Sequence, residues 1–378
     1  MKVIIIGQCQ GGNAKLWQDF LENYKGFKLV HYVCRNRCQS DFNIKSNRKR
    51  VFRFYNLFVH FPLIQKVWVR LVSLIVLPLF IRLMDKMFKY DIIHFQGNYE
   101  PEFNFRLMNA TKAKAVITIY GSDFYQRYLK GDDSYIRSFE RTINRANHIL
   151  FNFEKARQDF LQKINIPVKC SVGCIGVNDF WSTPVVEKFA KDSGVTRLLS
   201  ARGMYAYNNV EVLVDSFIDL YANNSAYELY LINGYGWDGP VKESIIKKVK
   251  TVSNIHAVVG KWITDDELKK YYDLCDYNFC IGSTDQLSVS IVYGFMHKSM
   301  NILSPLDNYK ELDVLQFRSH YFLEEVSHKS IKGLLRSLPK RDSSLLEDDR
   351  IKAIEIFSFA NRFENTKRVF DSLLKLND

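Results

Sequence analysis

The sequence lacks several features that would assign it to a class of protein at once. Its first residues run directly into an apolar, β-branched segment and show no secretory leader, and its seven cysteines are an odd number without the density of a disulfide scaffold. We therefore expect a reduced, cytoplasmic protein. None of the cysteine pairs has the two-residue spacing of a zinc knuckle, so buried cysteines are favoured over a metal site.

Long apolar runs are also missing. The longest, from Leu71 to Ile81, is interrupted by Ser73 and Pro78, and it falls short of the roughly 18 to 20 residues that cross a bilayer. The sequence therefore predicts no membrane-spanning helix. It also contains no internal repeat and no low-complexity tract.

What is present is a long, basic, aromatic-rich chain. Its 378 residues are 47% apolar, enough for two hydrophobic cores, and a formal charge of +12 favours an acidic partner. Charge alone leaves open whether that partner is a nucleic acid, an anionic membrane or a phosphorylated small molecule.

Apolar strand patterns alternate with helical spacing along the whole chain, which is typical of parallel sheets built from βα units. In the first half the predicted strands are 2–6, 91–95, 115–120 and 148–153. In the second half they are 196–201, 228–232, 255–259 and 277–281. Residues 351–376 have the periodicity of one long terminal helix or a pair.

This order predicts two Rossmann-like, doubly wound parallel-sheet domains that face each other. We expect residues 1–178 to form the first, with a C-terminal helix at 355–378 crossing back to it, and residues 179–354 to form the second. Because open parallel sheets bind ligands at the carboxyl ends of their strands, ligands should lie between the two domains.

Two loops at strand ends in the first half are candidate ligand sites. The loop 7–13 combines glycines with a helix N-terminus, which suits an anion, although a plain βα turn explains it equally well. The other loop ends in Gly121, Ser122 and Asp123, and Asp123 could accept a proton or a sugar hydroxyl there. Ser122 or Asp123 could instead cap the helix that begins near Phe124.

Two loops in the second half predict an anion site. Arg202 directly follows a strand, where its guanidinium could bind a diphosphate through two hydrogen bonds; a surface ion pair is the alternative. The segment 283–290 follows the strand that ends at Ile281 and precedes a helix. Its hydroxyls, its free N–H groups and the carboxylate of Asp285 should therefore converge at a helix N-terminus.

A basic stretch beside an aromatic, aliphatic segment has the composition of an interfacial membrane anchor. Seven Lys and Arg residues and a single acid, Asp41, occupy 35–53, and large apolar residues follow up to Leu77. The cations that flank the apolar segment are Lys66, Arg70, Arg82 and Lys86. A core helix beside a solvated basic loop is the alternative. Binding of nucleic acid is not expected, because no recognised module accompanies the aromatic residues.

Taken in order, short motifs over nearly the whole chain resemble the large family of retaining GT-B glycosyltransferases that includes bacterial lipopolysaccharide, capsule and exopolysaccharide sugar transferases. Residues 91–94 resemble its Asp-Ile-Ile-His strand, and 117–123 resemble its Thr-x-His-Gly-x-Asp segment, with Tyr120 in place of histidine. The stretches 145–155 and 174–180 also resemble sequence motifs of this family. Arg202 stands where the family's arginine contacts the donor pyrophosphate, and 285–295 stands at its paired-glutamate motif.

Three positions depart from the family's pattern. The lysine expected a few residues beyond the arginine is absent, and 207–209, Tyr-Asn-Asn, stands there. Asp285 replaces the first glutamate, and Tyr293 replaces the second, which holds the nucleotide ribose in the family. A tyrosine hydroxyl cannot accept two ribose hydroxyls as a carboxylate does, so donor binding is altered, weakened or lost.

The resemblance implies retaining, metal-independent transfer of a hexosyl or related unit from a nucleotide sugar, with no cofactor. The acceptor it implies is a membrane-associated glycan or a lipid-linked acceptor in bacterial surface-polysaccharide synthesis. The protein would be peripheral at the inner face of the plasma membrane. The candidate catalytic residues are Asp123 and Asp285. The candidate donor-binding residues are Arg202, Asn208, Ser283, Thr284, Asp285, Gln286, Leu287, Ser288, Ser290 and Tyr293. The candidate acceptor-side residues are Gly11, Gly12, Asn13, His94, Gly121 and Ser122.

Two other functions stay open. Tyr293 and the missing lysine would suit a catalytically silent GT-B subunit that binds a glycan or a partner transferase. A nicotinamide-dependent oxidoreductase would use the first glycine loop, but it would need a glycine fingerprint and an acidic residue about twenty positions further on.

Overall fold

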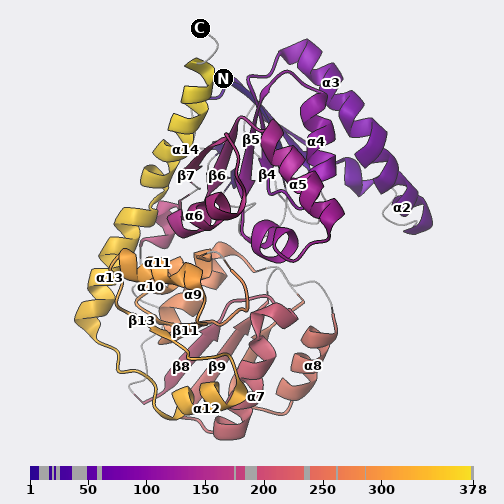
Figure 1. Cartoon of the computed structure of the whole chain (residues 1–378). Helices are drawn as coiled ribbons and strands as arrows, with labels where there is room; N and C mark the ends of the chain where they lie inside the picture. Colours follow the sequence, from indigo (N-terminus) through magenta and orange to yellow (C-terminus); the bar gives the residue numbers. More distant parts are fainter. Residues whose placement is uncertain are drawn as a thin grey trace. The chain divides into compact units, whose positions relative to one another are not determined.

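The computed structural model describes residues 1–7, 17–18, 21–22, 26–35, 49–57, 62–173, 176–183, 194–233, 239–260, 263–285 and 287–375. The chain forms two compact units, one of Met1–Gly176 with Phe359–Asp378 and one of Val177–Ser358. Each unit is built on one sheet in which all paired strands are parallel (Figure 1).

The first unit has a seven-stranded sheet in the order β3-β2-β1-β4-β5-β6-β7. Its strands are β1 (Lys2–Gly7), β2 (Leu29–Cys34), β3 (Lys49–Phe52), β4 (Ile92–Gln96), β5 (Lys114–Ile119), β6 (His148–Phe151) and β7 (Lys169–Val172). Its helices are α2 (Pro62–Leu71), α3 (Leu77–Phe88), α4 (Pro101–Asn109), α5 (Asp133–Arg145), α6 (Glu154–Lys163) and α14 (Phe359–Leu374). The four strands predicted in this half are confirmed as β1, β4, β5 and β6.

The two faces of this sheet are covered differently. Ile93 and Phe95 of β4 belong to the main core of the unit, together with buried residues of α3, α4, α5 and α6. His94 points to the opposite face, because successive side chains of a strand alternate. There its ring lies 5.7 Å from that of Phe370 in α14. Thr366 of α14 also donates a hydrogen bond of 2.7 Å to the carbonyl of Gly173.

The second unit has a six-stranded sheet in the order β10-β9-β8-β11-β12-β13. Its strands are β8 (Thr196–Ser200), β9 (Tyr227–Ile232), β10 (Ile255–Val258), β11 (Tyr277–Cys280), β12 (Met300–Leu303) and β13 (His320–Phe322). Its helices are α7 (Val210–Tyr221), α8 (Pro240–Val249), α9 (Asp265–Leu274), α10 (Val289–Met296), α11 (Glu311–Val314), α12 (His328–Arg336) and α13 (Ser343–Phe357). The predicted strands are confirmed as β8 to β11. The order places β8, β11 and β12 side by side, so the loops that follow them share one edge of the sheet.

The C-terminal segment is a pair of helices, α13 and α14, rather than one. The backbone breaks at Ser358, and there Val177 forms a parallel bridge with Ser358 and donates its N–H to the carbonyl of Phe357 at 2.8 Å. The two places where the chain passes from one unit to the other therefore lie side by side.

The segment with the composition of an anchor differs from expectation in two ways. Residues Ile64–Phe88 form one helical segment of 25 residues, a π-helical turn at Val72–Val76 joining α2 to α3, and by length and composition this segment could cross a membrane. The apolar segment is therefore longer than the unbroken apolar run suggested, because the cations lie toward the two ends of the helical segment and leave its middle apolar. Length and composition alone are weak evidence that it spans a membrane. Within the preceding basic stretch, the structure describes residues 35 and 49–53, and Arg35 is not simply solvated. The Arg35 side chain is only 6% exposed, and it packs over the ring of Phe103.

Candidate functional site

Polar residues from three neighbouring strand ends of the second unit meet around Asp285. Arg202 follows β8, and its Nη2 lies 2.9 Å from Oδ2 of Asp285, which follows β11. From the loop after β12, the Tyr309 hydroxyl donates to the same Oδ2 at 3.0 Å, and the Asn308 amide donates to the Asp285 carbonyl at 2.6 Å. The structure thus brings together Arg202 and Asp285, the two charged donor-site candidates.

This cluster is largely but not completely buried. The side chains of Arg202 and Asp285 are 18% and 16% exposed, so a ligand can reach the pair without unfolding the unit. Burial raises the pKa of the Asp285 carboxyl, while Arg202 and Tyr309 act in the opposite direction. When Asp285 is ionised the pair carries no net charge, and an anion that binds Arg202 then has to compete with the Asp285 carboxylate.

A helix N-terminus adjoins the cluster. Ser288 is the N-cap of α10, and its side chain makes no capping hydrogen bond to the first turn. Ser283 is exposed and Thr284 is half-buried, so both can reach a ligand. Ser283 is held in place by a 2.7 Å hydrogen bond from its N–H to the carbonyl of Tyr207.

Other donor-site candidates turn inward. Leu287 is buried, and the Ser290 hydroxyl pairs with the hydroxyl of Tyr272 at 2.7 Å inside the unit. Asn208 is also buried; it donates to the Gly203 carbonyl at 2.7 Å and accepts a long hydrogen bond from Arg202. Asn208 therefore shapes the loop that presents the arginine. Gln286 lies outside the described residues.

Tyr293 has a packing role that the sequence did not reveal. Its ring stacks on the indole of Trp181, with centroids 3.7 Å apart and planes 12° from parallel. Trp181 is buried, and it belongs to the short segment that opens the second unit after the chain crossing. The residue that the motif resemblance sets at a glutamate position is therefore in contact with an aromatic side chain of its own unit.

In the first unit, Asp123 is fully buried and its carboxylate organises two loops. Its Oδ1 accepts the backbone N–H groups of Tyr120 and Gly121 at 3.1 and 2.9 Å, and its Oδ2 accepts that of Asn98 at 2.9 Å. Burial raises the pKa of this carboxyl, and the backbone hydrogen bonds oppose the rise. This geometry fits the structural alternative, in which Asp123 holds the backbone, better than direct contact with a substrate.

The remaining acceptor-side candidates divide in the same way. His94 is completely buried; its Nε2 pairs with the Thr118 hydroxyl at 2.8 Å, and burial lowers its pKa to about 3, so it stays neutral near pH 7. Gly121 has φ of 105°, a conformation that glycine adopts without strain, and the Ser122 hydroxyl pairs with that of Tyr99 at 3.0 Å. Gly11, Gly12 and Asn13 lie outside the described residues.

Comparison with solved structures identifies the architecture, although the chain matches no protein-family model and no curated protein sequence. A sucrose-phosphate synthase from Thermosynechococcus elongatus superposes with a TM-score of 0.77 at 12% identity, with both chains covered completely. A glycosyltransferase from Rickettsia africae superposes with a TM-score of 0.72 at 14% sequence identity, with 99% of each chain covered. HepE from Anabaena in complex with UDP superposes with a TM-score of 0.68 at 12% sequence identity, with 98% of this chain and 100% of HepE covered. The chain has the GT-B fold.

The sequence analysis missed four residues near the Arg202–Asp285 cluster of this GT-B chain. Asn308 and Tyr309 hold Asp285. The sequence did contain a signal for them, since the mostly apolar segment 300–303 followed by a polar turn predicts one more strand and its loop. Tyr205 and Tyr207 stack with centroids 5.3 Å apart, and Tyr207 is exposed. Their spacing in the sequence does not show that they stack.

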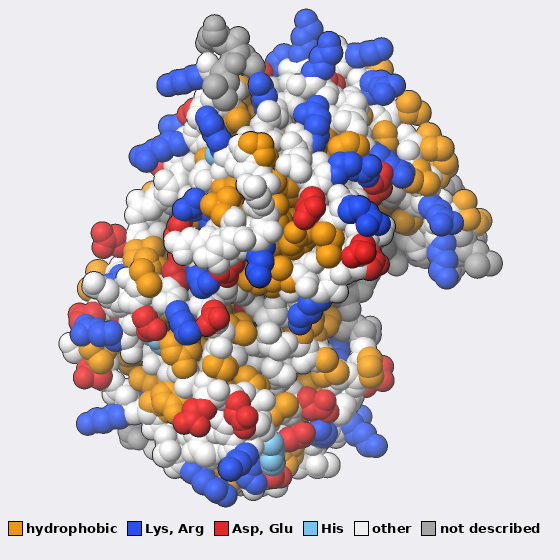
Figure 2. Space-filling model, viewed as in Figure 1, with side chains coloured by type: hydrophobic (Ala, Val, Ile, Leu, Met, Phe, Trp, Pro, Cys, Tyr) orange, Lys and Arg blue, Asp and Glu red, His pale blue; other side chains and the backbone are white. Residues whose placement is uncertain are grey.

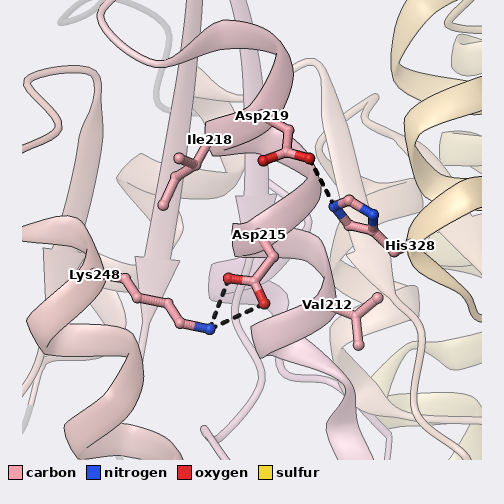
Figure 3. A pocket seen from close by; sticks show the side chains of 6 residues that line it. All are labelled: Val212, Asp215, Ile218, Asp219, Lys248 and His328. Carbon is pink, nitrogen blue, oxygen red and sulfur yellow. Dashed lines mark hydrogen bonds and ion pairs between the residues drawn. The ribbon is translucent and has the colours of Figure 1, made fainter.

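A pocket on the outside of the second unit shows paired charges rather than a free site (Figure 3). It lies among α7, α8 and α12, not at the strand ends. Lys248 contacts both oxygens of Asp215 at 2.7 and 2.9 Å, and Asp219 pairs with His328 at 3.2 Å. We assign no ligand to this pocket.

Neither a metal site nor a disulfide is seen in the described part of the chain. There, no group of three or more His, Cys, Asp or Glu side chains could hold a metal ion. No two of the described cysteines form a disulfide with each other; Cys34, Cys275 and Cys280 are buried and Cys170 is half-buried.

We expect the Asp123→Asn substitution to lower stability rather than to act on chemistry. The amide NH2 would face at least one of the three backbone donors, and an unsatisfied buried group of this kind costs about 1–3 kcal/mol. Urea denaturation measures this loss. Asp132 caps α5 by accepting the N–H of Tyr135, and asparagine caps equally well, so Asp132→Asn is the matched control with little effect. Unchanged stability with lost activity in Asp123→Asn would restore the catalytic interpretation.

Proposed function

We propose that this protein is a glycosyltransferase that uses a nucleotide-sugar donor bound to its second unit. The observation that carries the proposal is the cluster of Arg202, Asp285 and the α10 N-terminus at the carboxyl ends of β8 and β11 in a GT-B fold. Ligands of open parallel sheets bind at this edge. The UDP in the HepE complex, and the UDP and glucose in a second HepE structure, show which ligands that neighbour accommodates.

In this proposal Arg202 and the N–H groups of α10 stabilise the negative charge that develops on the leaving diphosphate. The arriving diphosphate takes Arg202 away from Asp285. Because burial already favours the protonated form of Asp285, a nearby dianion favours it further, and the carboxyl then contacts the sugar or a phosphate oxygen. No metal is needed for this charge balance, and no cofactor takes part.

The finer assignments rest on the sequence motifs. We infer a retaining transfer of a hexosyl or related unit to a glycan or lipid-linked acceptor in bacterial surface-polysaccharide synthesis, on the cytoplasmic side of the membrane. The first unit would hold the acceptor near Gly121 and Ser122, at the carboxyl end of β5.

A catalytically silent GT-B subunit is the second candidate, and a specific observation favours it. Tyr293, which stands at the sequence position of the family's ribose ligand, is not a carboxylate, and its ring packs against Trp181. Such a subunit would bind a glycan or a partner transferase and would release no nucleotide.

Thermal unfolding with UDP-, GDP- and TDP-sugars tests both candidates. A ligand at about 100 times its Kd stabilises the folded state by about 2.7 kcal/mol, so the cognate donor should raise the melting temperature clearly. Release of nucleoside diphosphate should accompany that shift, whereas a shift without release would favour the silent subunit. A folded sample that responds to no nucleotide sugar contradicts the proposal, and a response to NAD would point to an oxidoreductase.

A further inference from the structure

The helical segment α2–α3 of the first unit carries apolar side chains on two opposite sides. The inner side includes Val72, Leu77, Ile81 and Met84, which belong to the main core of the unit. The outer side repeats every fourth residue and is formed by Val67, Leu71, Ile75, Leu79, Leu83 and Met87. We call these six residues the outer stripe; they are between 40% and 70% exposed.

Exposure of this kind is concentrated in one place. Sixteen large hydrophobic side chains are exposed in the described part of the chain, and ten of them lie between Leu57 and Met87. Figure 2 shows orange side chains gathered along the α2–α3 edge, with blue ones among them. Scattered exposed apolar residues are ordinary, but a contiguous row along a helix marks a surface that is covered in use.

The charges beside the outer stripe have one sign. Lys66 and Arg70 lie near one end of the segment and Arg82 and Lys86 near the other, and all four are exposed. Asp85 is the only acid between residues 57 and 89. Its two oxygens accept the backbone N–H groups of Tyr90 and Lys112, both at 3.0 Å, so it serves the fold of the unit.

We propose that the outer stripe lies in the interface of an anionic lipid bilayer, with the α2–α3 segment parallel to the membrane plane. Aliphatic side chains on one face and cations along its borders match the acyl boundary and the anionic headgroups respectively. The surface is thus an attachment site for lipid, separate from the Arg202–Asp285 cluster.

The packing of the inner side decides between lying on the membrane and crossing it. Val72, Leu77 and Ile81 are completely buried among the strands and helices of the unit. A segment that entered the bilayer across its whole thickness would pull these residues out of the core and open the first unit. In-plane binding covers the outer stripe and leaves the core intact.

The distribution of cations decides between a bilayer and a second copy of the chain. Basic residues stand at both ends of the stripe, so a helix from a second copy would place cations against cations whether it ran parallel or antiparallel. Such contacts are destabilising. An anionic surface satisfies both ends at once.

Co-sedimentation with vesicles, in the absence of any nucleotide, tests the inference. The full-length protein should bind phosphatidylglycerol-containing vesicles at low salt and bind pure phosphatidylcholine vesicles weakly. The triple variant Ile75→Ser, Leu79→Ser, Leu83→Ser should lose binding. The double variant Arg82→Ser, Lys86→Ser should bind roughly 30-fold more weakly, because each cation near an anionic surface contributes about fivefold.

The control variant Val314→Ser, Ile351→Ser removes two exposed apolar side chains from the second unit, 79% and 56% exposed, and should bind as the wild type does. All the changed residues are exposed, so each variant should keep the wild-type melting temperature, and this is checked first.

Four results would overturn the inference. The folded wild type could ignore anionic vesicles, or the triple serine variant could bind them as well as the wild type does. Binding to neutral and anionic vesicles alike, with resistance to alkaline carbonate, would show a spanning helix. A concentration-dependent dimer in sedimentation velocity, abolished by the triple serine variant, would show that a second copy covers the stripe. Because no nucleotide is used, each of these results leaves the proposed transfer activity untouched.

Discussion

Replacing Arg202 by methionine should weaken binding of the donor's nucleoside diphosphate about 100-fold and remove measurable transfer. A charge-assisted hydrogen bond to a phosphate oxygen contributes about 1.5–3 kcal/mol, and loss of one donor to a developing oxyanion lowers kcat by about 100- to 1,000-fold. Methionine keeps much of the side-chain volume and removes every donor. Isothermal titration with UDP, GDP and TDP measures the first effect, and nucleotide release measures the second.

The companion variant Asp285→Asn makes this prediction specific. Asparagine keeps an oxygen that can accept the Tyr309 hydroxyl, but it removes the negative charge that competes for Arg202. Nucleoside diphosphate should therefore bind Asp285→Asn at least as tightly as it binds the wild type, while transfer falls because the sugar loses its carboxyl contact. If Arg202→Met bound the nucleotide as the wild type does, the ligand would not touch Arg202, and the assigned donor site would be wrong.

The sequence predicted the parts of the fold that depend on local patterns. Apolar runs such as 2–6 and 277–281 were sufficient to predict β1 and β11, because a buried parallel strand needs a nearly continuous apolar segment. The sequence also predicted that Arg202 and Asp285 lie in loops at strand ends, since each stands within a few residues of the end of such a run. Strand β3, with two cations in Lys49–Phe52, and β13, with only three residues, lack that pattern and were missed.

What the sequence could not predict are contacts between distant residues. Asp123 and Asn98 are 25 positions apart, and only the pairing of β4 with β5 brings the Asn98 N–H to the Asp123 carboxylate. A carboxylate that binds three backbone N–H groups and one that binds a sugar look identical in sequence. The helix at 62–88 shows a similar ambiguity, because its periodicity does not reveal which apolar side faces the core.

Tyr293 is the clearest example of a contact that the sequence could not predict, because its ring packs against a residue more than a hundred positions away. The stack of Tyr293 on Trp181 holds the segment 178–183 in place. Two hydrogen bonds hold the same segment: the Lys269 ammonium donates to the Phe180 carbonyl at 2.6 Å, and the Arg350 guanidinium donates to the Ser182 carbonyl at 2.9 Å. The tyrosine thus anchors the start of the second unit where the chain enters it.

Trp181→Ala should consequently be the most destabilising single change in this segment. Removing a buried tryptophan leaves a large cavity and costs about 3–5 kcal/mol. For a unit of this size that corresponds to a fall in melting temperature of roughly 10 °C, which differential scanning fluorimetry detects. Trp181→Phe keeps an aromatic ring against Tyr293 and should lose much less. A Trp181→Ala variant as stable as the wild type would mean that the stack contributes nothing.

The same stack predicts the result of restoring the family's carboxylate. Tyr293→Glu would set a charge against the face of the buried Trp181 indole, where the negative ring face repels it and burial penalises it. This variant should therefore lose stability and gain no nucleotide affinity. If position 293 instead contacted the ribose, a glutamate there would bind the nucleotide more tightly than the tyrosine does. If titration showed tighter binding in a stable Tyr293→Glu protein, the stack would be incidental. Loss of stability without tighter binding would support a packing role for the tyrosine.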